Sequence, residues 1–366
     1  MSSDSISRRE FGKLAVVGLG SILIPPMAGL HGFRPSTKLS EFPQAERLGR
    51  VLAGRVPIKK RPDIDSPDVG TLYEDDVVVW LREVVGSRPL WNSQRFIETP
   101  DGYLYAANIQ PVKNLPNQPL EQLPEANKNG GMWVEVSVPY ADLTLDNPPA
   151  RSPWLKGNLH PRVYYSQILW VDQIKNDSSG QIQYRVKELY GSYGDIFWVQ
   201  GAALRPLQPE EFTPIHPEVE DKTVVVDVTY QTLSCYEGKD EIYFTRVSTG
   251  DKFDAQGNPV DKWSTPVGPH HIWRKMVSVH MSGGTTGGGY DLPGIGWTSL
   301  FSGNGVAIHS TFWHNNFGVP MSHGCVNARP HDAEFVFRWT APTVPADTGD
   351  VTISGTTSTE VVVIEG

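Results

Sequence analysis

Hydrophobic and polar residues alternate in short runs along most of this 366-residue chain. Alternation of this kind favours β-strands with one buried face, and the Pro and Gly residues between the runs are typical of turns. Segments rich in β-branched and aromatic residues predict strands within 69–80, 102–107, 164–171, 184–190, 195–206, 223–228 and 241–247. We therefore expect a mainly β protein.

One short helix is expected near the C-terminal end of the chain. Residues 333–340 follow Pro330 and predict this helix, and Asp332 stands near its start, where a carboxylate can cap free backbone N–H groups. The region from 221 to 366 should then be a mainly antiparallel β-sandwich with a small helical element.

The first residues have the pattern of an export signal. Arg8, Arg9 and Lys13 precede an apolar stretch from Leu14 to Ile24, which is the order of charged and hydrophobic segments in a secretory signal. The paired arginines followed by Phe11 and Lys13 resemble the twin-arginine motif, which directs export of a folded protein.

The apolar stretch ends at Pro25 and Pro26, well short of the roughly 20 residues that a membrane-spanning helix needs. The small residues Met27-Ala28-Gly29 do not form a clear Ala-x-Ala cleavage site. A cleaved signal and a retained membrane anchor therefore both remain open. In either case we expect a protein of the cell envelope, in the periplasm or at the outer face of the cytoplasmic membrane.

Charge and cysteine content narrow the range of functions. The net charge of −9, without a basic stripe, argues against a nucleic-acid partner. Two cysteines in an exported protein raise the alternative of a disulfide. Cys235 stands beside a predicted strand and is better explained as a packed thiol, whereas Cys325 stands in a turn-rich segment and is expected to be free.

The strongest candidate for a catalytic site is the segment Ser322-His323-Gly324-Cys325-Val326-Asn327, with His309 upstream. A thiol is mostly protonated at neutral pH and needs a nearby base or positive field to become a nucleophile. His309 is the candidate base, and the amides of Gly324 and Cys325 are candidates to hold an oxyanion. Glycine at 324 would also let the backbone approach a substrate.

These residues resemble the signature of the L,D-transpeptidase catalytic domain, the YkuD family. That signature is an upstream histidine followed by Ser/Thr-His-Gly-Cys, an aliphatic residue, and Arg or Asn. The resemblance covers 221–366 and extends to the segments 247–250 and 264–268. It implies that Cys325 is acylated, that His309 is the base and that the carbonyl of Ser310 orients the imidazole.

The same resemblance implies further contacts around the thiol. His323 and Gly324 would form part of the pocket wall, and Ser322 and Asn327 would contact substrate. Asn327 stands where many relatives carry arginine, and Arg329, two residues on, is a candidate to replace that charge.

The glycine-rich segment 282–289 lacks Gly-Lys-Ser/Thr, so it is not a phosphate-binding loop. A lid over the site and a plain solvated loop are both compatible with its composition. Tyr290 and Trp297 follow this segment and are candidate substrate-facing aromatic residues.

A zinc site is the alternative for the histidines and the thiol. His309, His314, His323 and Cys325 would together complete a tetrahedral shell. The sequence has no Cys-x-x-Cys pair or His-Glu-x-x-His helix, and a thiolate held by zinc would be a poor free nucleophile. We expect acyl transfer that needs no metal or organic cofactor.

Two modules are expected between the signal and the catalytic domain. The first resembles a bacterial SH3-like barrel, and the second repeats the pattern less clearly. Their aromatic residues either bind glycan or peptide or fill the barrel cores. The expected order is a signal at 1–33, a linker at 34–48, a module at 49–112, a linker at 113–131, a module at 132–208, a linker at 209–220 and the catalytic domain at 221–366.

The resemblance thus implies a transferase that acts on peptidoglycan stem peptides. Cys325 would attack the bond after the third residue of a tetrapeptide stem, D-alanine would leave, and an amine of a neighbouring stem would complete a 3-3 cross-link. Carbapenems are implied inhibitors. Two alternatives stay open: an L,D-carboxypeptidase, a hydrolase that uses water as acceptor, and a wall-binding protein with an idle catalytic domain.

Overall fold

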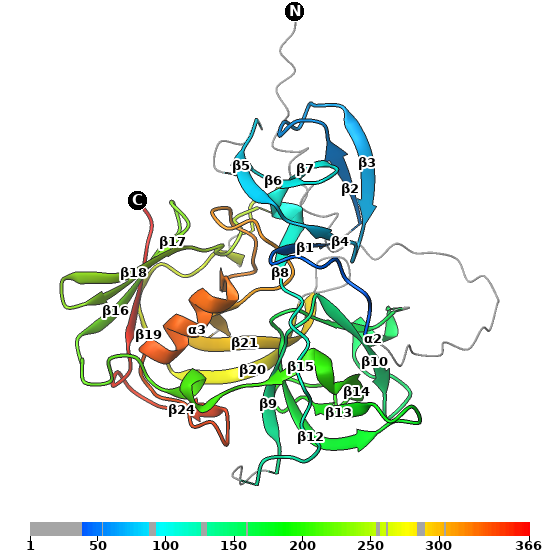
Figure 1. Cartoon of the computed structure of the whole chain (residues 1–366). Helices are drawn as coiled ribbons and strands as arrows, with labels where there is room; N and C mark the ends of the chain where they lie inside the picture. The colour runs from blue at the N-terminus through cyan, green and yellow to red at the C-terminus, as the bar shows by residue number, and fades with distance from the viewer. Residues whose placement is uncertain are drawn as a thin grey trace, which may run out of the picture.

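The computed structural model describes residues 39–52, 54–87, 93–125, 130–158, 160–253, 257–260, 263–283, 290–303 and 305–366. The predicted export signal and residues 284–289 of the glycine-rich segment lie outside these residues. The part of the chain that is described is mainly β, as expected, and its strands form separate sheets (Figure 1). Within it, no helix combines the length and the apolar character needed to cross a membrane.

Residues 48–112, here called the first module, form two small antiparallel sheets. The strands are β1 Leu48–Val51, β2 Arg55–Lys59, β3 Asp68–Tyr73, β4 Val77–Val79, β5 Arg82–Val85, β6 Arg95–Thr99, β7 Gly102–Tyr105 and β8 Ile109–Val112. One sheet has the order β3–β2–β7–β6–β5 and the other the order β4–β1–β8. A short 3₁₀ helix, η1 (Ala106–Asn108), joins β7 to β8. The predicted strand region 69–80 is two strands, because Asp75 turns the chain with a φ of 68°.

Residues 132–206, the second module, form one seven-stranded antiparallel sheet. The strands are β9 Met132–Val136, β10 Tyr140–Leu145, β11 Arg162–Tyr164, β12 Ile168–Asn176, β13 Ile182–Lys187, β14 Ile196–Gln200 and β15 Leu204–Pro206. Their order is β11–β10–β14–β13–β12–β9–β15. The short helix α2 (Pro153–Lys156) follows β10, and the 3₁₀ helix η2 (Gly201–Ala203) precedes β15. The predicted strand 164–171 is interrupted at Ser166, whose φ is 70°.

Residues 222–364, the C-terminal domain, contain two five-stranded sheets. The strands are β16 Lys222–Asp227, β17 Thr232–Glu237, β18 Asp240–Arg246, β19 Gly268–His271, β20 Arg274–Gly283, β21 Tyr290–Ser302, β22 Val306–Ser310, β23 Val326–Ala328, β24 Asp350–Thr352 and β25 Glu360–Ile364. The orders are β18–β17–β16–β25–β19 and β23–β22–β21–β20–β24. Pairing is antiparallel except for β16 with β25 and β22 with β23. The strands predicted at 223–228 and 241–247 are confirmed as β16 and β18.

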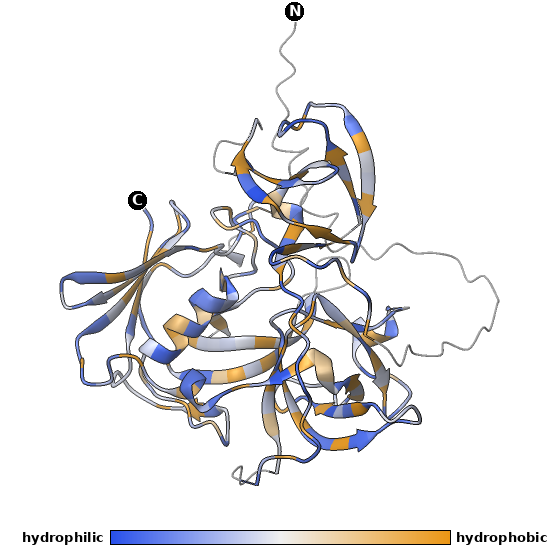
Figure 2. Ribbon diagram, viewed as in Figure 1, coloured by the Kyte–Doolittle hydropathy of each residue, from blue (hydrophilic) through white to orange (hydrophobic). Residues whose placement is uncertain are grey.

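The cores explain why these strands form. Figure 2 shows hydrophobic and hydrophilic residues alternating along them, and each buried face joins a hydrophobic cluster. The main cluster of the C-terminal domain also includes Trp133, Ile168 and Trp170 of the second module. The second module's cluster includes Leu48 and Val112 of the first. The three parts therefore pack on one another through shared apolar contacts.

The predicted helix is present as α3 (Pro330–Trp339), which packs on β21 and β22. The expected cap is wrong: Arg329 occupies the N-cap position, and Asp332 lies inside the first turn. The Asp332 carboxylate instead accepts hydrogen bonds from Tyr243 Oη (2.6 Å) and Thr245 Oγ1 (2.7 Å) of β18. It ties the start of α3 to the neighbouring sheet.

Candidate functional site

Two parallel strands bring the motif residues to one edge of the second C-terminal sheet. β22 pairs with β23 so that His309 lies opposite Asn327. Cys325 immediately precedes β23, and the backbone N–H of Ala307 in β22 donates a hydrogen bond to its thiol. The candidate nucleophile therefore stands one residue before the strand that pairs with the strand of the candidate base.

The imidazole of His309 is buried and held in one tautomer. Its Nδ1 lies 2.9 Å from the carbonyl oxygen of Ser310. Because a carbonyl only accepts, Nδ1 carries the proton and Nε2 keeps a free lone pair. Burial lowers the pKa of His309 to about 4, against a smaller opposing effect of the Ser310 hydrogen bond. At neutral pH the imidazole is uncharged and able to accept a proton at Nε2.

The thiol of Cys325 is partly buried against Met276, Leu300 and Ala307. Burial raises its pKa to about 11, although the Ala307 hydrogen bond acts in the opposite direction. The Sγ atom lies 3.7 Å from the carbonyl oxygen of Gly305. The thiol and the imidazole are therefore both neutral at rest, and the thiol must lose a proton to become a nucleophile.

The turn before the thiol is fixed by its own hydrogen bonds. Ser322 Oγ donates to the Cys325 carbonyl (2.5 Å) and accepts from the Gly324 N–H (3.1 Å). Gly324 has a φ of 122°, a conformation that favours glycine. The expected oxyanion role of the Gly324 amide does not match this geometry, because that N–H already donates to Ser322.

A second segment supports the same turn. Thr265 Oγ1 donates to the Gly324 carbonyl (2.8 Å) and accepts from the Gly250 N–H (2.9 Å). A Cβ at residue 250 would lie 1.9 Å from the carbonyl oxygen of Trp263, so only glycine fits there. The segments 247–250 and 264–268, which the sequence linked to the motif, thus border it in space.

Two aromatic rings enclose His323. Trp263 meets it edge to face at a centroid distance of 4.4 Å, and Tyr290 lies 5.5 Å away. Burial raises the pKa of Tyr290, and the charge of Cys325 adds to that shift, which places the phenol near the thiol. Trp263 was not predicted; its position directly before the 264–268 segment was the available signal.

Asn327 is buried and engages His314 rather than the open side of the site. Its carboxamide lies 2.9 Å from His314 Nε2. The Asn316 N–H lies 3.2 Å from His314 Nδ1. Burial lowers the pKa of His314 to about 3, with a smaller contribution from His309.

Two other residues do not match the substrate-facing positions expected of them. Trp297 is 3% exposed and packs on Phe337 in the core of the C-terminal domain. Arg329 Nη1 lies 3.4 Å from Asp332 Oδ2, and its guanidinium lies over the Phe317 ring at 4.6 Å. Internal packing accounts for both side chains.

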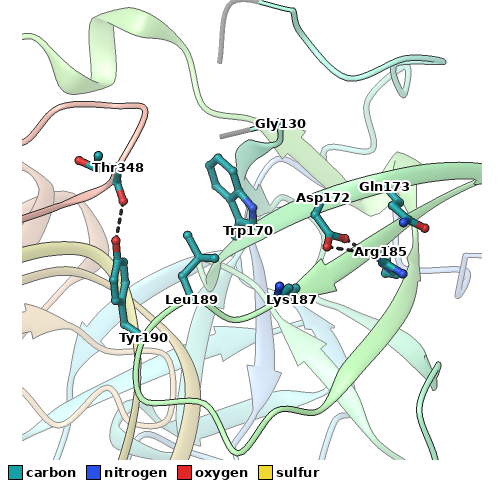
Figure 3. A pocket seen from close by; sticks show the side chains of 9 residues that line it. All are labelled: Gly130, Trp170, Asp172, Gln173, Arg185, Lys187, Leu189, Tyr190 and Thr348. Atoms are coloured by element: carbon teal, nitrogen blue, oxygen red, sulfur yellow. Dashed lines mark hydrogen bonds and ion pairs between the residues drawn. The ribbon is translucent and has the colours of Figure 1, made fainter. Parts of the chain in front are cut away.

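One cavity lies away from these residues. It has a volume of about 520 Å³ and opens between β12, β13 and the loop that contains Thr348 (Figure 3). Its polar walls are partly self-paired, since Arg185 contacts Asp172 and Tyr190 Oη donates to the Thr348 carbonyl. None of the predicted site residues lines it. Among the described residues, no three His, Cys, Asp or Glu side chains are grouped to ligate a metal.

The chain resembles several known proteins. Solved structures that resemble the chain include an Enterococcus faecium L,D-transpeptidase mutant, with 23% identity over 41% of this chain and 52% of that chain, and a TM-score of 0.30. An L,D-transpeptidase from Mycobacterium smegmatis shares 15% identity over 61% of this chain and 99% of that chain, with a TM-score of 0.30. L,D-transpeptidase 3 from Mycobacterium tuberculosis shares 15% identity over 54% of this chain and 92% of that chain, again with a TM-score of 0.30.

The match to the E. faecium structure thus spans about half of that chain. No curated protein matches this chain. Residues 221–363 match the family model described as the L,D-transpeptidase catalytic domain (YkuD).

Proposed function

We propose that this protein is an exported peptidoglycan L,D-transpeptidase that forms 3-3 cross-links through an acyl-enzyme on Cys325. The main support is the family match over 221–363. In addition, Cys325 stands directly before β23, which pairs with the strand of His309, and His309 Nε2 is left unprotonated. The domain arrangement with SH3-like modules ahead of the catalytic domain remains part of this proposal.

The reaction follows from that pair. Cys325 Sγ attacks the carbonyl carbon after the third residue of a donor tetrapeptide, and His309 Nε2 takes the thiol proton. The C–N bond then breaks, the proton passes from His309 to the departing amine of D-alanine, and a thioester remains. An acceptor amine attacks the thioester, His309 receives the amine proton, and the thiol is restored when that proton returns to sulfur.

The oxyanion needs a donor other than the Gly324 amide, because that N–H is used within the turn. The N–H of Cys325 itself is the donor we assign to this role. His323, held between Trp263 and Tyr290, forms a wall beside the thiol in the proposal.

The wall-binding alternative receives little support from the aromatic residues of the modules. Trp80, Trp133, Trp170 and Phe197 are all buried in hydrophobic clusters. They serve as core residues, which was one of the two roles expected of the aromatic side chains.

Product analysis tests the proposal. Purified enzyme is incubated with a tetrapeptide-containing donor, with and without an acceptor stem, and the products are identified by mass spectrometry. A cross-linked dimer supports transpeptidation, tripeptide alone supports the carboxypeptidase, and unchanged donor supports a non-catalytic role. Cys325→Ala is the control, in which dimer formation should cease.

A further inference from the structure

Residues 311–317, here called the bridging segment, follow β22 directly and therefore continue the chain from His309 and Ser310. One side of the segment contacts the candidate site. Trp313 lies 5.7 Å from the His309 ring, measured between centroids, and His314 is bonded to Asn327 at the end of the motif. The segment is thus connected to both the base and the strand that follows the thiol.

The opposite side of the bridging segment contacts the first module. Asn315 Nδ2 donates to the carbonyl of Ala106 (3.1 Å), and the Asn315 N–H donates to the carbonyl of Ala107 (3.3 Å). Arg95 Nη2 of β6 donates to the Asn315 carbonyl (2.8 Å). The side-chain Nδ2, the backbone N–H and the backbone carbonyl of Asn315 are therefore all hydrogen-bonded to the first module. The residue is 2% exposed.

Arg50 joins the same segment to both modules. It lies in β1, is 3% exposed, and donates to Gln110 Oε1, to Asp75 Oδ1 and to the Phe312 carbonyl (3.2 Å). Its guanidinium also lies 4.0 Å from the ring centroid of Tyr164, which stacks on Phe312. A charge held by this many partners fixes the backbone that it contacts.

The His309 imidazole depends on that backbone. Its tautomer is set by the Ser310 carbonyl, and Ser310 is the residue immediately before the bridging segment. A displacement of this segment would move the carbonyl that fixes Nδ1 and the Trp313 ring beside the imidazole. Displacements of about 1 Å in a catalytic group are enough to lower rates by up to a hundredfold.

We propose that the first module is a working part of the catalytic site, in which Asn315 and Arg50 act as positioning residues that hold the bridging segment and thereby orient His309. The measurement of kcat and KM for cross-linking rests on the proposed function. The measurement of Cys325 alkylation does not. The family match begins at residue 221, so the groups that complete the site on this side come from outside the matched domain.

The chain supplies a matched control. Asn117, which lies in the linker between the modules, donates from Nδ2 to the carbonyl of Ala202 in η2 (3.0 Å), as Asn315 does to Ala106 in η1. Asn117→Ala removes an equivalent bond without touching the bridging segment. For Arg50→Lys, the control is Arg185→Lys, which disturbs the bidentate pair of Arg185 with Asp172 in the second module.

The experiment measures the alkylation rate of Cys325 by iodoacetamide against pH, and kcat and KM for cross-linking, in the full-length variants. Asn315→Ala and Arg50→Lys should lower the alkylation rate at pH 7 and kcat by about tenfold, with KM within about twofold. In these variants the alkylation rate should rise with pH only as the Cys325 thiol ionises, because His309 no longer assists the loss of the thiol proton. Asn117→Ala and Arg185→Lys should retain the wild-type profile.

The controls separate positioning from general stability. All variants are compared by thermal unfolding, and the expected pattern requires that Asn315→Ala lose no more stability than Asn117→Ala. Equal alkylation profiles in Asn315→Ala, Asn117→Ala and wild type would overturn the inference. If wild type forms no cross-link but alkylation still depends on Asn315, the proposed function fails and the positioning role stands.

Discussion

Burial keeps two histidines of the C-terminal domain uncharged at neutral pH. Burial lowers the pKa of His309 to about 4 and that of His314 to about 3. Both rings are therefore uncharged at neutral pH. In the proposed reaction, the transfer of the thiol proton must therefore accompany the formation of the C–S bond.

This arrangement makes the stability of the protein depend on pH. Both histidines are protonated in the unfolded chain below pH 6.5 but remain neutral in the folded protein down to about pH 4. The folded state is therefore most stable above pH 6.5. As the pH falls below 6.5, each histidine lowers the free energy of unfolding by about 1.4 kcal/mol per pH unit. Denaturant titrations between pH 7 and 5 should show a smaller decline in His314→Gln than in wild type. Parallel declines in the two proteins would contradict this account.

At the scale of elements, α3 depends on two buried lysines at its C-terminal end. Lys275 Nζ donates to the carbonyls of Phe337, Thr340 and Pro342, and Lys222 Nζ donates to that of Trp339. The last carbonyls of a helix have no partner within it, and cations near this end are favourable. The side chain of Lys275 thus replaces water for one carbonyl of α3, for that of the C-cap Thr340 and for that of Pro342 beyond the helix.

Lys275→Met should therefore destabilise the fold by roughly 3 kcal/mol, because buried carbonyls lose their donor while the apolar volume stays similar. Equilibrium unfolding in urea measures the loss. Lys175→Met, at an exposed position over the Trp198 ring, is the control and should change stability by less than about 1 kcal/mol. A loss in Lys275→Met no larger than in the control would show that the three contacts contribute nothing.

The elements also show which features a sequence pattern can predict. β16 and β18 were predicted because β-branched residues alternate between two faces, a local property. The break at Ser166 was missed, because its positive φ is not part of hydrophobic alternation. Asp332 was assigned as a cap from its position alone, whereas its actual partners, Tyr243 and Thr245, come from a distant strand.

The same distinction applies to the candidate site. The motif around Cys325 and the contact of His309 with Ser310 are local in the chain and follow from the resemblance. The contacts of Asn315 with Ala106 and of Trp263 with His323 depend on how separate parts pack. Trp297 was expected to face substrate because it follows the glycine-rich segment, but core packing places its indole inside the domain.

At the scale of the whole molecule, a buried ionic cluster connects the second module to the C-terminal domain. His280 of β20 lies between Glu188 (2.8 Å) and Asp291 (2.7 Å), and its side chain is 1% exposed. Asp291 is adjacent to Tyr290, which borders His323. The cluster therefore connects Glu188 of the second module to β21, whose first residue, Tyr290, borders the candidate site.

The charge of His280 should hold these parts together most strongly at low pH. Burial alone would lower its pKa, but the hydrogen bonds and charges of Glu188 and Asp291 outweigh it and raise the pKa above its usual value. Its stabilising contribution is full below pH 6.5 and is lost as the pH rises through the raised pKa. The difference in unfolding free energy between wild type and His280→Gln should be larger at pH 6 than at pH 9. A difference that grows with pH would contradict the assignment.

Export is a separate property of the whole chain. If the twin-arginine pathway recognises Arg8 and Arg9, replacing both by lysine should leave the precursor in the cytoplasm. Fractionation with an antibody to the protein measures this, with a Lys59→Arg/Lys60→Arg variant in the first module as the matched control. Arrival of the Arg8→Lys/Arg9→Lys variant in the envelope would point to a different export route.

The most direct measurement of the central claim is the intact mass of the enzyme during turnover of a tetrapeptide donor. Wild-type protein should gain the mass of the donor minus D-alanine, the added group should map to the peptide that contains Cys325, and an acceptor stem should remove it with formation of a dimer. Cys325→Ala should show neither the adduct nor the dimer. A dimer formed by Cys325→Ala, or an adduct on the buried Cys235, would contradict the assignment of Cys325 as the nucleophile.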